Sequence, residues 1–253
     1  MEECVEGIIL YVTPFKESSE ILQVLTKEYG LIGLLCRGSK KVKSKFLNKT
    51  RIYNYAKFFI IYKKDGLSPL KEIDVIDYFT YFHQDITLIT YLSYLGSLTY
   101  QVVKQDNNKE ILNLFLTTLK KISENLDPLV LTNILEIKYL KYLGINLNLR
   151  TCIKCGNSDN IVTLNGSLGG LICRNCYQKE YLVNKKTIMM IRNYANIDIL
   201  KIKEIKISPL VKTEINLFLS NYYENFTGLY VKNKELLNKL AMWPCKKDEV
   251  LLY

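Results

Sequence analysis

Two short stretches decide how this chain folds: Cys152-Ile-Lys-Cys155-Gly156 and Cys173-Arg-Asn-Cys176. Seventeen residues separate the second cysteine from the third. Each pair forms a tight turn that presents two thiolates to one ion, and this spacing is typical of a tetrahedral zinc site. Four thiolates close the coordination shell, whereas a catalytic zinc keeps one position for water. The sequence therefore predicts one structural Zn²⁺ held by Cys152, Cys155, Cys173 and Cys176.

The stretch between the pairs, Thr163-Leu-Asn-Gly-Ser-Leu-Gly-Gly-Leu171, predicts a β-hairpin with flexible turn residues. A four-thiolate zinc site carries a formal charge of about −2, which nearby cations offset. Redox-active pairs and disulfides are the alternatives to a metal. Zinc in such a site contributes on the order of 10 kcal/mol to folding. The cations beside the site are Arg150, Lys154 and Arg174.

Composition places the chain among globular proteins. Hydrophobic residues make up 48% of its 253 residues, enough for a substantial core. Its seven cysteines are an odd number, and Cys4, Cys36 and Cys245 lie outside the two pairs. The acidic start, Met1-Glu-Glu, lacks the basic-then-apolar pattern of a signal peptide. These features predict a reducing, cytoplasmic location.

The segment 86–103 contains no charged residue and is long enough to be considered as a membrane span. Its threonines, serines and tyrosines weaken insertion, so we interpret it as a buried bundle helix and expect no membrane partner. The net charge of +10 suggests polyanionic partners, but high lysine content also accompanies the Asn, Ile and Tyr bias of the sequence. The position of the charge therefore carries more information than its total.

The first eighty residues alternate in polarity as strands do. Five short strands in such a length are typical of a small closed barrel of the OB type, a fold that removes exposed edges and often binds single-stranded nucleic acid. We therefore predict a nucleic-acid-binding domain over residues 1–80. The five β-rich runs, separated by turn signals, are residues 5–12, 20–26, 31–36, 54–62 and 71–77.

From about residue 83 the period becomes helical. Asp127-Pro128 is a typical helix start and Gly144 is a natural stop. The predicted fold class is therefore α+β: an N-terminal five-stranded OB-fold β-barrel followed by an α-helical domain over residues 81–253. The zinc hairpin is inserted into that domain at about residues 150–180.

The loop between the third and fourth predicted strands, residues 37–51, holds seven Lys or Arg and no acidic residue. Such a patch binds nucleic acid mainly through counterion release, and a solvated charged loop is the alternative. The aromatic residues that follow, Tyr53, Tyr55 and Phe59, either stack on bases or, as we favour, pack within the protein. The candidate DNA-binding residues are Arg37, Lys40, Lys41, Lys43, Lys45, Lys49 and Arg51.

Little in the sequence points to an enzyme. The chain has a single histidine, His83, so the sequence offers little basis for a metal site built from histidines or for a Ser–His–Asp triad. We interpret His83 as a packing or capping residue. A G-x-x-x-x-G-K-[ST] phosphate loop is absent, and so is the H-x-E of the zinc deaminases. We expect a non-catalytic protein with no small-molecule substrate.

The order of these parts resembles the bacterial RecO family of recombination mediators over almost the whole chain. Each matching piece is modest apart from the cysteines, but their order and spacing together are specific. The pieces are Glu6-Gly-Ile-Ile-Leu10, residues 15–22, Leu25-Thr-Lys-Glu-Tyr-Gly30, the start of the basic loop, the two cysteine pairs with Gly169-Gly170, and residues 218–228. The tail after Leu240 departs from the family's pattern.

The resemblance implies a protein that binds single- and double-stranded DNA and anneals complementary strands. With RecR it would help to load recombinase on strands coated with single-stranded DNA-binding protein during repair. The resemblance also implies a pocket in the helical domain for the C-terminal tail of that coat protein, but assigns no residues to it. By position it assigns zinc to the four cysteines and DNA contact to Arg37, Lys40, Lys41, Lys43 and Lys45.

Two other functions stay open on the sequence. An RNA-binding accessory factor would use the same barrel and zinc hairpin. A structural adaptor would use zinc and helices for protein contacts, with an inert basic loop. Preference for structured RNA over single-stranded DNA at matched salt favours the first, and unchanged DNA affinity after removal of the loop's charge favours the second.

Overall fold

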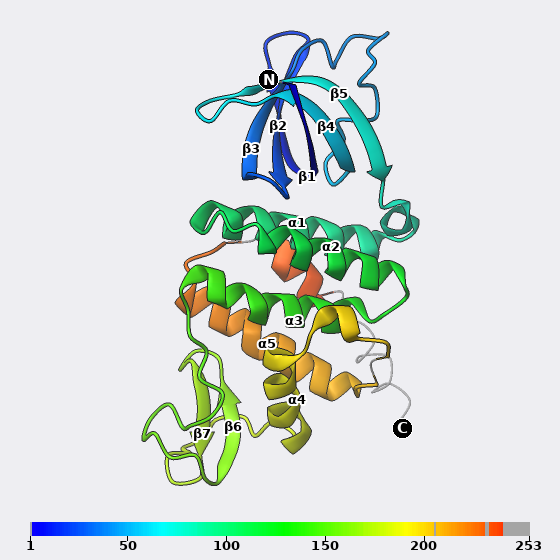
Figure 1. Cartoon of the computed structure of the whole chain (residues 1–253). Coiled ribbons are helices and arrows are strands. Elements are labelled where there is room, and N and C mark those ends of the chain that lie inside the picture. The colour runs from blue at the N-terminus through cyan, green and yellow to red at the C-terminus, as the bar shows by residue number, and fades with distance from the viewer. Residues whose placement is uncertain (1, 205, 231–232, 240–253) are drawn as a thin grey trace. The chain divides into compact units, whose positions relative to one another are not determined.

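The structure is a computed structural model that describes residues 2–204, 206–230 and 233–239 (Figure 1). Contacts within the chain group it into two compact units, Met1–Leu119 and Lys120–Tyr253. The boundary between the units lies inside helix α2 (Glu110–Ser123). The sequence-based division at residue 80 stays a prediction.

Five strands close into a barrel at the start of the first unit, which confirms the predicted OB-like architecture. Their order around the barrel is β1-β2-β3-β5-β4. β3 and β5 pair in parallel through two residue pairs, whereas the other neighbours are antiparallel. The strands are β1 (Glu2–Phe15), β2 (Ser19–Thr26), β3 (Gly30–Cys36), β4 (Tyr55–Ile61) and β5 (Ser68–Asp77).

The barrel core is formed by the inward-facing side chains of these strands, as their alternating burial shows. In β4, Ala56, Phe58 and Ile60 are fully buried while Lys57 and Phe59 face out. One core residue comes from outside the strands. Phe46, in the basic loop, is 6% exposed and packs with the buried strand residues. The loop is thus attached to the barrel by an apolar side chain.

Helix α1 (Ile86–Gln105) belongs to the same unit and packs on the barrel. Gly96 allows a close approach, because a Cβ there would lie 2.1 Å from the Tyr53 ring. The Tyr53 hydroxyl donates to the Ser93 carbonyl at 3.4 Å, which confirms the packing interpretation for this tyrosine. Asn107, just after the helix, accepts the Leu31 N–H at 2.6 Å. In the part of the chain that the structure describes, no helix is both long and apolar enough to cross a membrane.

The second unit contains helices α3 (Pro128–Leu140), α4 (Lys185–Asn196) and α5 (Pro209–Phe226), and residues 233–239 are also helical. Asp127 caps α3 by accepting the N–H groups of Leu129 and Val130, and it also pairs with Lys212 at 2.6 Å. Gly144, with φ 69°, ends the 3-10 turn that follows α3. The predicted start and stop of this helical stretch are confirmed.

His83 and Cys245 are two further residues noted in the sequence. His83 is exposed in the 3-10 helix Thr80–Gln84, and its interpretation as a packing or capping residue stays a prediction. Cys245 and the tail 241–253 lie outside the described residues.

Candidate metal centre and nucleic-acid interface

The structure brings the four predicted cysteines together. Their sulfur atoms all lie within 4.8 Å of one another, and those of Cys155 and Cys173 are 3.6 Å apart. A disulfide needs about 2.05 Å between sulfurs. Four thiolates at ~2.3 Å from a zinc ion would lie ~3.8 Å from each other. The arrangement therefore suits a tetrahedral metal ion, and that pair is too far apart for a disulfide.

Backbone hydrogen bonds shape the two turns that present these sulfurs. In the first turn the Gly156 N–H donates to the Cys152 carbonyl at 2.8 Å, and the Cys152 N–H donates to the Asn157 carbonyl at 2.7 Å. Gly156 has φ 75°, a conformation that a residue without Cβ adopts at little cost. In the second turn the Cys176 N–H donates to the Cys173 carbonyl at 3.1 Å.

The environment of the sulfurs shifts the pKa values of two of the four thiols in opposite directions. Burial disfavours the Cys152 thiolate, but hydrogen bonds from the backbone N–H groups of Cys173, Cys155 and Lys154 outweigh burial and lower its pKa to about 6. In contrast, the pKa of Cys176 is raised to about 12. The largest cause is a hydrogen bond with Cys155, and the next is desolvation by burial. A divalent cation that binds this cluster displaces thiol protons such as that of Cys176.

Lys154 ties the two cysteine pairs together. Its Nζ donates to the Cys176 carbonyl at 3.2 Å and to Glu180 Oε1 at 3.0 Å. Backbone N–H groups of Gln178 and Glu180, with Lys154, lower the pKa of the Glu180 carboxyl to about 2. Of the three cations predicted to offset the thiolates, Lys154 is therefore already paired with a carboxylate.

The segment between the pairs forms the predicted hairpin, with antiparallel strands β6 (Ile161–Asn165) and β7 (Gly170–Cys173). Its turn is pressed against α5. A Cβ on Gly166 would lie 2.4 Å from the Phe218 carbonyl oxygen, and one on Gly169 would lie 2.7 Å from the Phe226 ring. The turn glycines thus permit a close contact with a helix, a role that the sequence pattern did not reveal.

Glu214 of α5 is a second link that sequence reasoning missed. Its carboxylate is 5% exposed and accepts hydrogen bonds from the Tyr181 hydroxyl at 3.1 Å, from the Asn184 N–H at 3.0 Å and from the Thr187 hydroxyl. These donors connect the exit of the hairpin and the start of α4 to α5. A signal was available, because Glu214 lies on the same helical face as the apolar Val211 and Phe218.

The first part of the basic loop is an open, positively charged surface. Five cations have exposed side chains there, and none of them forms an ion pair with any residue that the structure describes. Turn hydrogen bonds hold the backbone, including Ser44 N–H to the Lys41 carbonyl at 2.9 Å. The five are Arg37, Lys40, Lys41, Lys43 and Lys45.

The last two predicted cations of the loop are engaged by the protein. The half-buried Lys49 donates through Nζ to the Ile73 carbonyl at 2.9 Å. Arg51 is exposed, and its Nη2 donates to Asn48 Oδ1 at 2.8 Å. Lys49 therefore joins the loop to β5, while Arg51 keeps most of its donors for solvent or a ligand.

Comparison with known proteins gives the family of this fold and site. The family model described as "Recombination protein O N terminal" matches residues 1–79, and that described as "Recombination protein O C terminal" matches residues 83–235. The chain belongs to the RecO family. The gap between the two RecO matches falls in the 3-10 helix that joins β5 to α1.

RecO proteins of several bacteria align with nearly the whole chain. "DNA repair protein RecO" of Listeria monocytogenes serotype 4b is 30% identical, with 98% of this chain and 99% of the relative covered. The proteins of the same name from Halalkalibacterium halodurans and Bacillus pumilus are each 28% identical over 93% of this chain. The likeness to these RecO proteins therefore extends over both units of the chain.

Proposed function

We propose that this chain is a non-catalytic recombination mediator of DNA repair in the bacterial cytoplasm. It binds single- and double-stranded DNA, anneals complementary strands and, with RecR, helps to load recombinase on strands coated with single-stranded DNA-binding protein. The membership of the RecO family supports the repair role. The finer steps follow the properties that the family resemblance implies.

The basic loop carries this proposal. Five exposed cations without ion pairs among the described residues can neutralise phosphates at little desolvation cost, and Phe46 anchors their loop in the barrel core. Contacts of this kind do not read base edges, so binding is largely independent of sequence. If all five cations contact a single strand, log affinity falls with log salt at a slope of about −3.5.

We also propose that one structural Zn²⁺ is bound by Cys152, Cys155, Cys173 and Cys176. When bound, the ion would neutralise the thiolates and fix the two turns, and a closed shell of four sulfurs leaves no position for a substrate. The protein supplies the turn hydrogen bonds, the Lys154 bridge and the contacts with α5. The metal thus acts on the stability of the second unit.

A charge-reversal series tests the proposed function. We expect Lys40, Lys41, Lys43 and Lys45 changed together to Glu to lower single-strand affinity by orders of magnitude and to reduce the salt slope by about 2.8. The matched control changes four exposed lysines elsewhere on the barrel to Glu: Lys57, Lys63, Lys64 and Lys71. Annealing of complementary strands pre-coated with single-stranded DNA-binding protein is measured alongside.

The outcomes separate the three functions. Loss of binding and annealing in the loop variant alone supports a mediator that works through this surface. Equal losses in both quadruple variants mean that net charge alone matters, which contradicts a localised interface. Retained affinity in the loop variant favours the adaptor, and preference of the native protein for structured RNA at matched salt favours the RNA-binding factor.

A further inference from the structure

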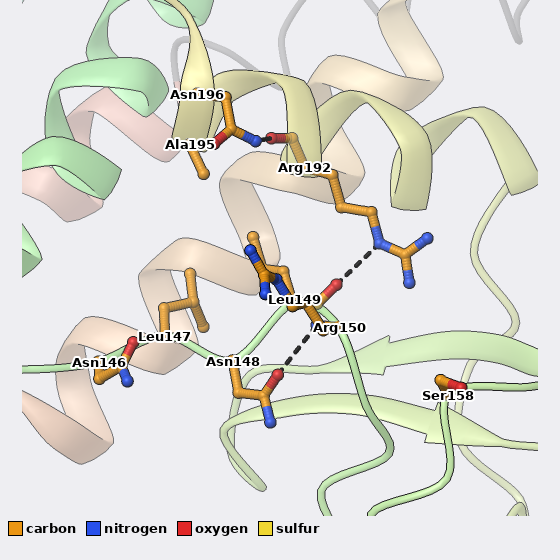
Figure 2. A pocket seen from close by; sticks show the side chains of 9 residues that line it. All are labelled: Asn146, Leu147, Asn148, Leu149, Arg150, Ser158, Arg192, Ala195 and Asn196. Carbon is orange, nitrogen blue, oxygen red and sulfur yellow. Dashed lines mark hydrogen bonds between the residues drawn. The ribbon is translucent and has the colours of Figure 1, made fainter.

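The second unit contains a cavity that the metal centre and the basic loop do not account for. Its volume is about 770 Å³, within the range of roughly 300–1,000 Å³ that small-molecule sites occupy. Figure 2 shows it between α4 and the segment 146–150, with Ser158, which lies between the two cysteine pairs, at one side. Of its nine lining residues only Leu147, Leu149 and Ala195 are apolar.

Two arginines enter this cavity from different elements, Arg192 from α4 and Arg150 from the segment before the first cysteine pair (Figure 2). Arg192 Nε donates to the Leu149 carbonyl at 2.8 Å, which fixes the plane of its guanidinium. Its two Nη groups make no hydrogen bond to the described residues. Arg150 is exposed, and its backbone N–H is held by Asn148 Oδ1 at 2.9 Å.

The residues that line the cavity carry two positive charges and no negative one. No acidic residue lines it, and neither arginine forms an ion pair within the residues that the structure describes. The hydroxyl of Ser158 already donates to Asp159, and one amide hydrogen of Asn196 is used within α4. A fixed guanidinium, a second arginine and nearby amide groups match the oxygens of a phosphate group, which arginine binds through paired hydrogen bonds.

We propose that this cavity binds a phosphate group of a nucleic-acid strand, in addition to the phosphate contacts proposed for the basic loop. The inference rests on the proposed DNA-binding function and extends it to the second unit. A free nucleotide presents the same phosphate chemistry. An acidic peptide with apolar anchors is a poorer match, because such a ligand needs an apolar lining and this one is mainly amide and guanidinium.

The test combines one pocket variant with the loop variant in the full-length, metal-loaded chain. Arg150→Glu reverses a charge at an exposed side chain and leaves the Arg192 contact in place. Lys179→Glu makes the same change at an exposed position of the same unit that does not line the cavity. Binding of a labelled oligothymidylate is measured across a salt series, with thymidine monophosphate, inorganic phosphate and an acidic peptide as separate probes.

We expect Arg150→Glu to lower oligonucleotide affinity about fivefold and the salt slope by ~0.7, the loss of one phosphate contact. Lys179→Glu should leave both unchanged. Affinities are compared at equal metal content, because Arg150 precedes the proposed zinc ligand Cys152 by two residues. Arg150→Glu should cause the same decrease when it is added to the variant with Lys40, Lys41, Lys43 and Lys45 changed to Glu. The proposal for the loop and the proposal for the cavity are therefore tested separately.

Other outcomes decide the ligand. Monophosphate binding that disappears with Arg150→Glu, together with unchanged oligonucleotide affinity, keeps the phosphate site but identifies the free nucleotide as its source. The proposal is overturned if Arg150→Glu and Lys179→Glu behave alike towards the oligonucleotide, the monophosphate and phosphate. Peptide binding that alone depends on Arg150 also overturns it, in favour of a protein partner.

Discussion

Two segments carry the proposed chemistry of this chain, the basic loop and the cysteine hairpin, and they are attached to the rest of the protein in different ways. The basic loop, residues 37–51, is anchored by Phe46 in the barrel core. The cysteine hairpin, residues 152–176, has two short strands, and a two-stranded hairpin alone is marginally stable in water. One apolar side chain attaches the loop to the barrel core. The hairpin combines buried strand residues such as Leu171 and Ile172 with four clustered sulfurs and a contact with α5.

The difference extends to how each region uses its cations. In the loop, the five cations from Arg37 to Lys45 have no carboxylate partner among the described residues, whereas in the hairpin Lys154 is paired with Glu180. A free cation is available to a ligand, and a paired one stabilises the fold. We infer that the loop is a binding surface and that the hairpin is mainly a support.

The sharpest way to break this comparison is to remove the metal. We expect Cys152→Ser, or a chelator, to lower the stability of the second unit by on the order of 10 kcal/mol at neutral pH, because structural zinc supplies folding free energy. Amide hydrogen exchange should become fast over residues 150–180 and should stay slow in the barrel strands. Metal content is measured by elemental analysis, with one zinc per native chain expected.

The control for this experiment is Cys4→Ser. Cys4 is an exposed cysteine on β1, far in sequence from the cluster. It should leave zinc content and hydrogen exchange unchanged. Full metal content and an unchanged melting temperature in Cys152→Ser would show that Cys152 does not bind a metal that stabilises the hairpin.

Removal of the loop's anchor should have the next largest effect. Phe46→Ala deletes an aromatic side chain from the barrel core, which costs about 3–5 kcal/mol of the free energy of unfolding. The neighbouring Leu47 is 59% exposed, so Leu47→Ala should change stability by at most about 0.5 kcal/mol. Denaturant unfolding followed by circular dichroism measures both. Similar costs for the two variants would mean that Phe46 does not hold the loop.

The sequence was most informative where one strong local rule applied. Two C-x-x-C pairs allow few arrangements, so the cluster of four sulfurs followed directly, and the Asp127-Pro128 start and the Gly144 stop were equally local. The alternation of the first eighty residues gave the strands, although β1 is longer than its pattern indicates.

Contacts between distant segments were not predictable in the same way. Gly166 looks like any turn glycine in the sequence, and only the approach of Phe218 shows why a side chain is excluded there. Phe46 stands among lysines, where periodicity gives no hint that it enters a core. The cavity at Arg150 and Arg192 joins residues about forty positions apart, and a single sequence does not report such a separation.

The smallest expected effects come from single cations of the basic loop. They distinguish a cation that stabilises the fold from one that binds DNA. Lys49→Met removes the donor to the Ile73 carbonyl and should cost about 1.5–3 kcal/mol of stability, typical of a hydrogen bond to a charged group, with little change in DNA affinity. Arg37→Gln removes an exposed cation and should do the reverse: unchanged unfolding, but a salt slope smaller by ~0.7. Both are read by thermal unfolding and by anisotropy of a labelled single strand. Suppose instead that Lys49→Met weakens DNA binding as much as Arg37→Gln while the fold stays intact. The Lys49 ammonium would then exchange its hydrogen bond to the Ile73 carbonyl for a phosphate contact, and the interface would extend to Lys49.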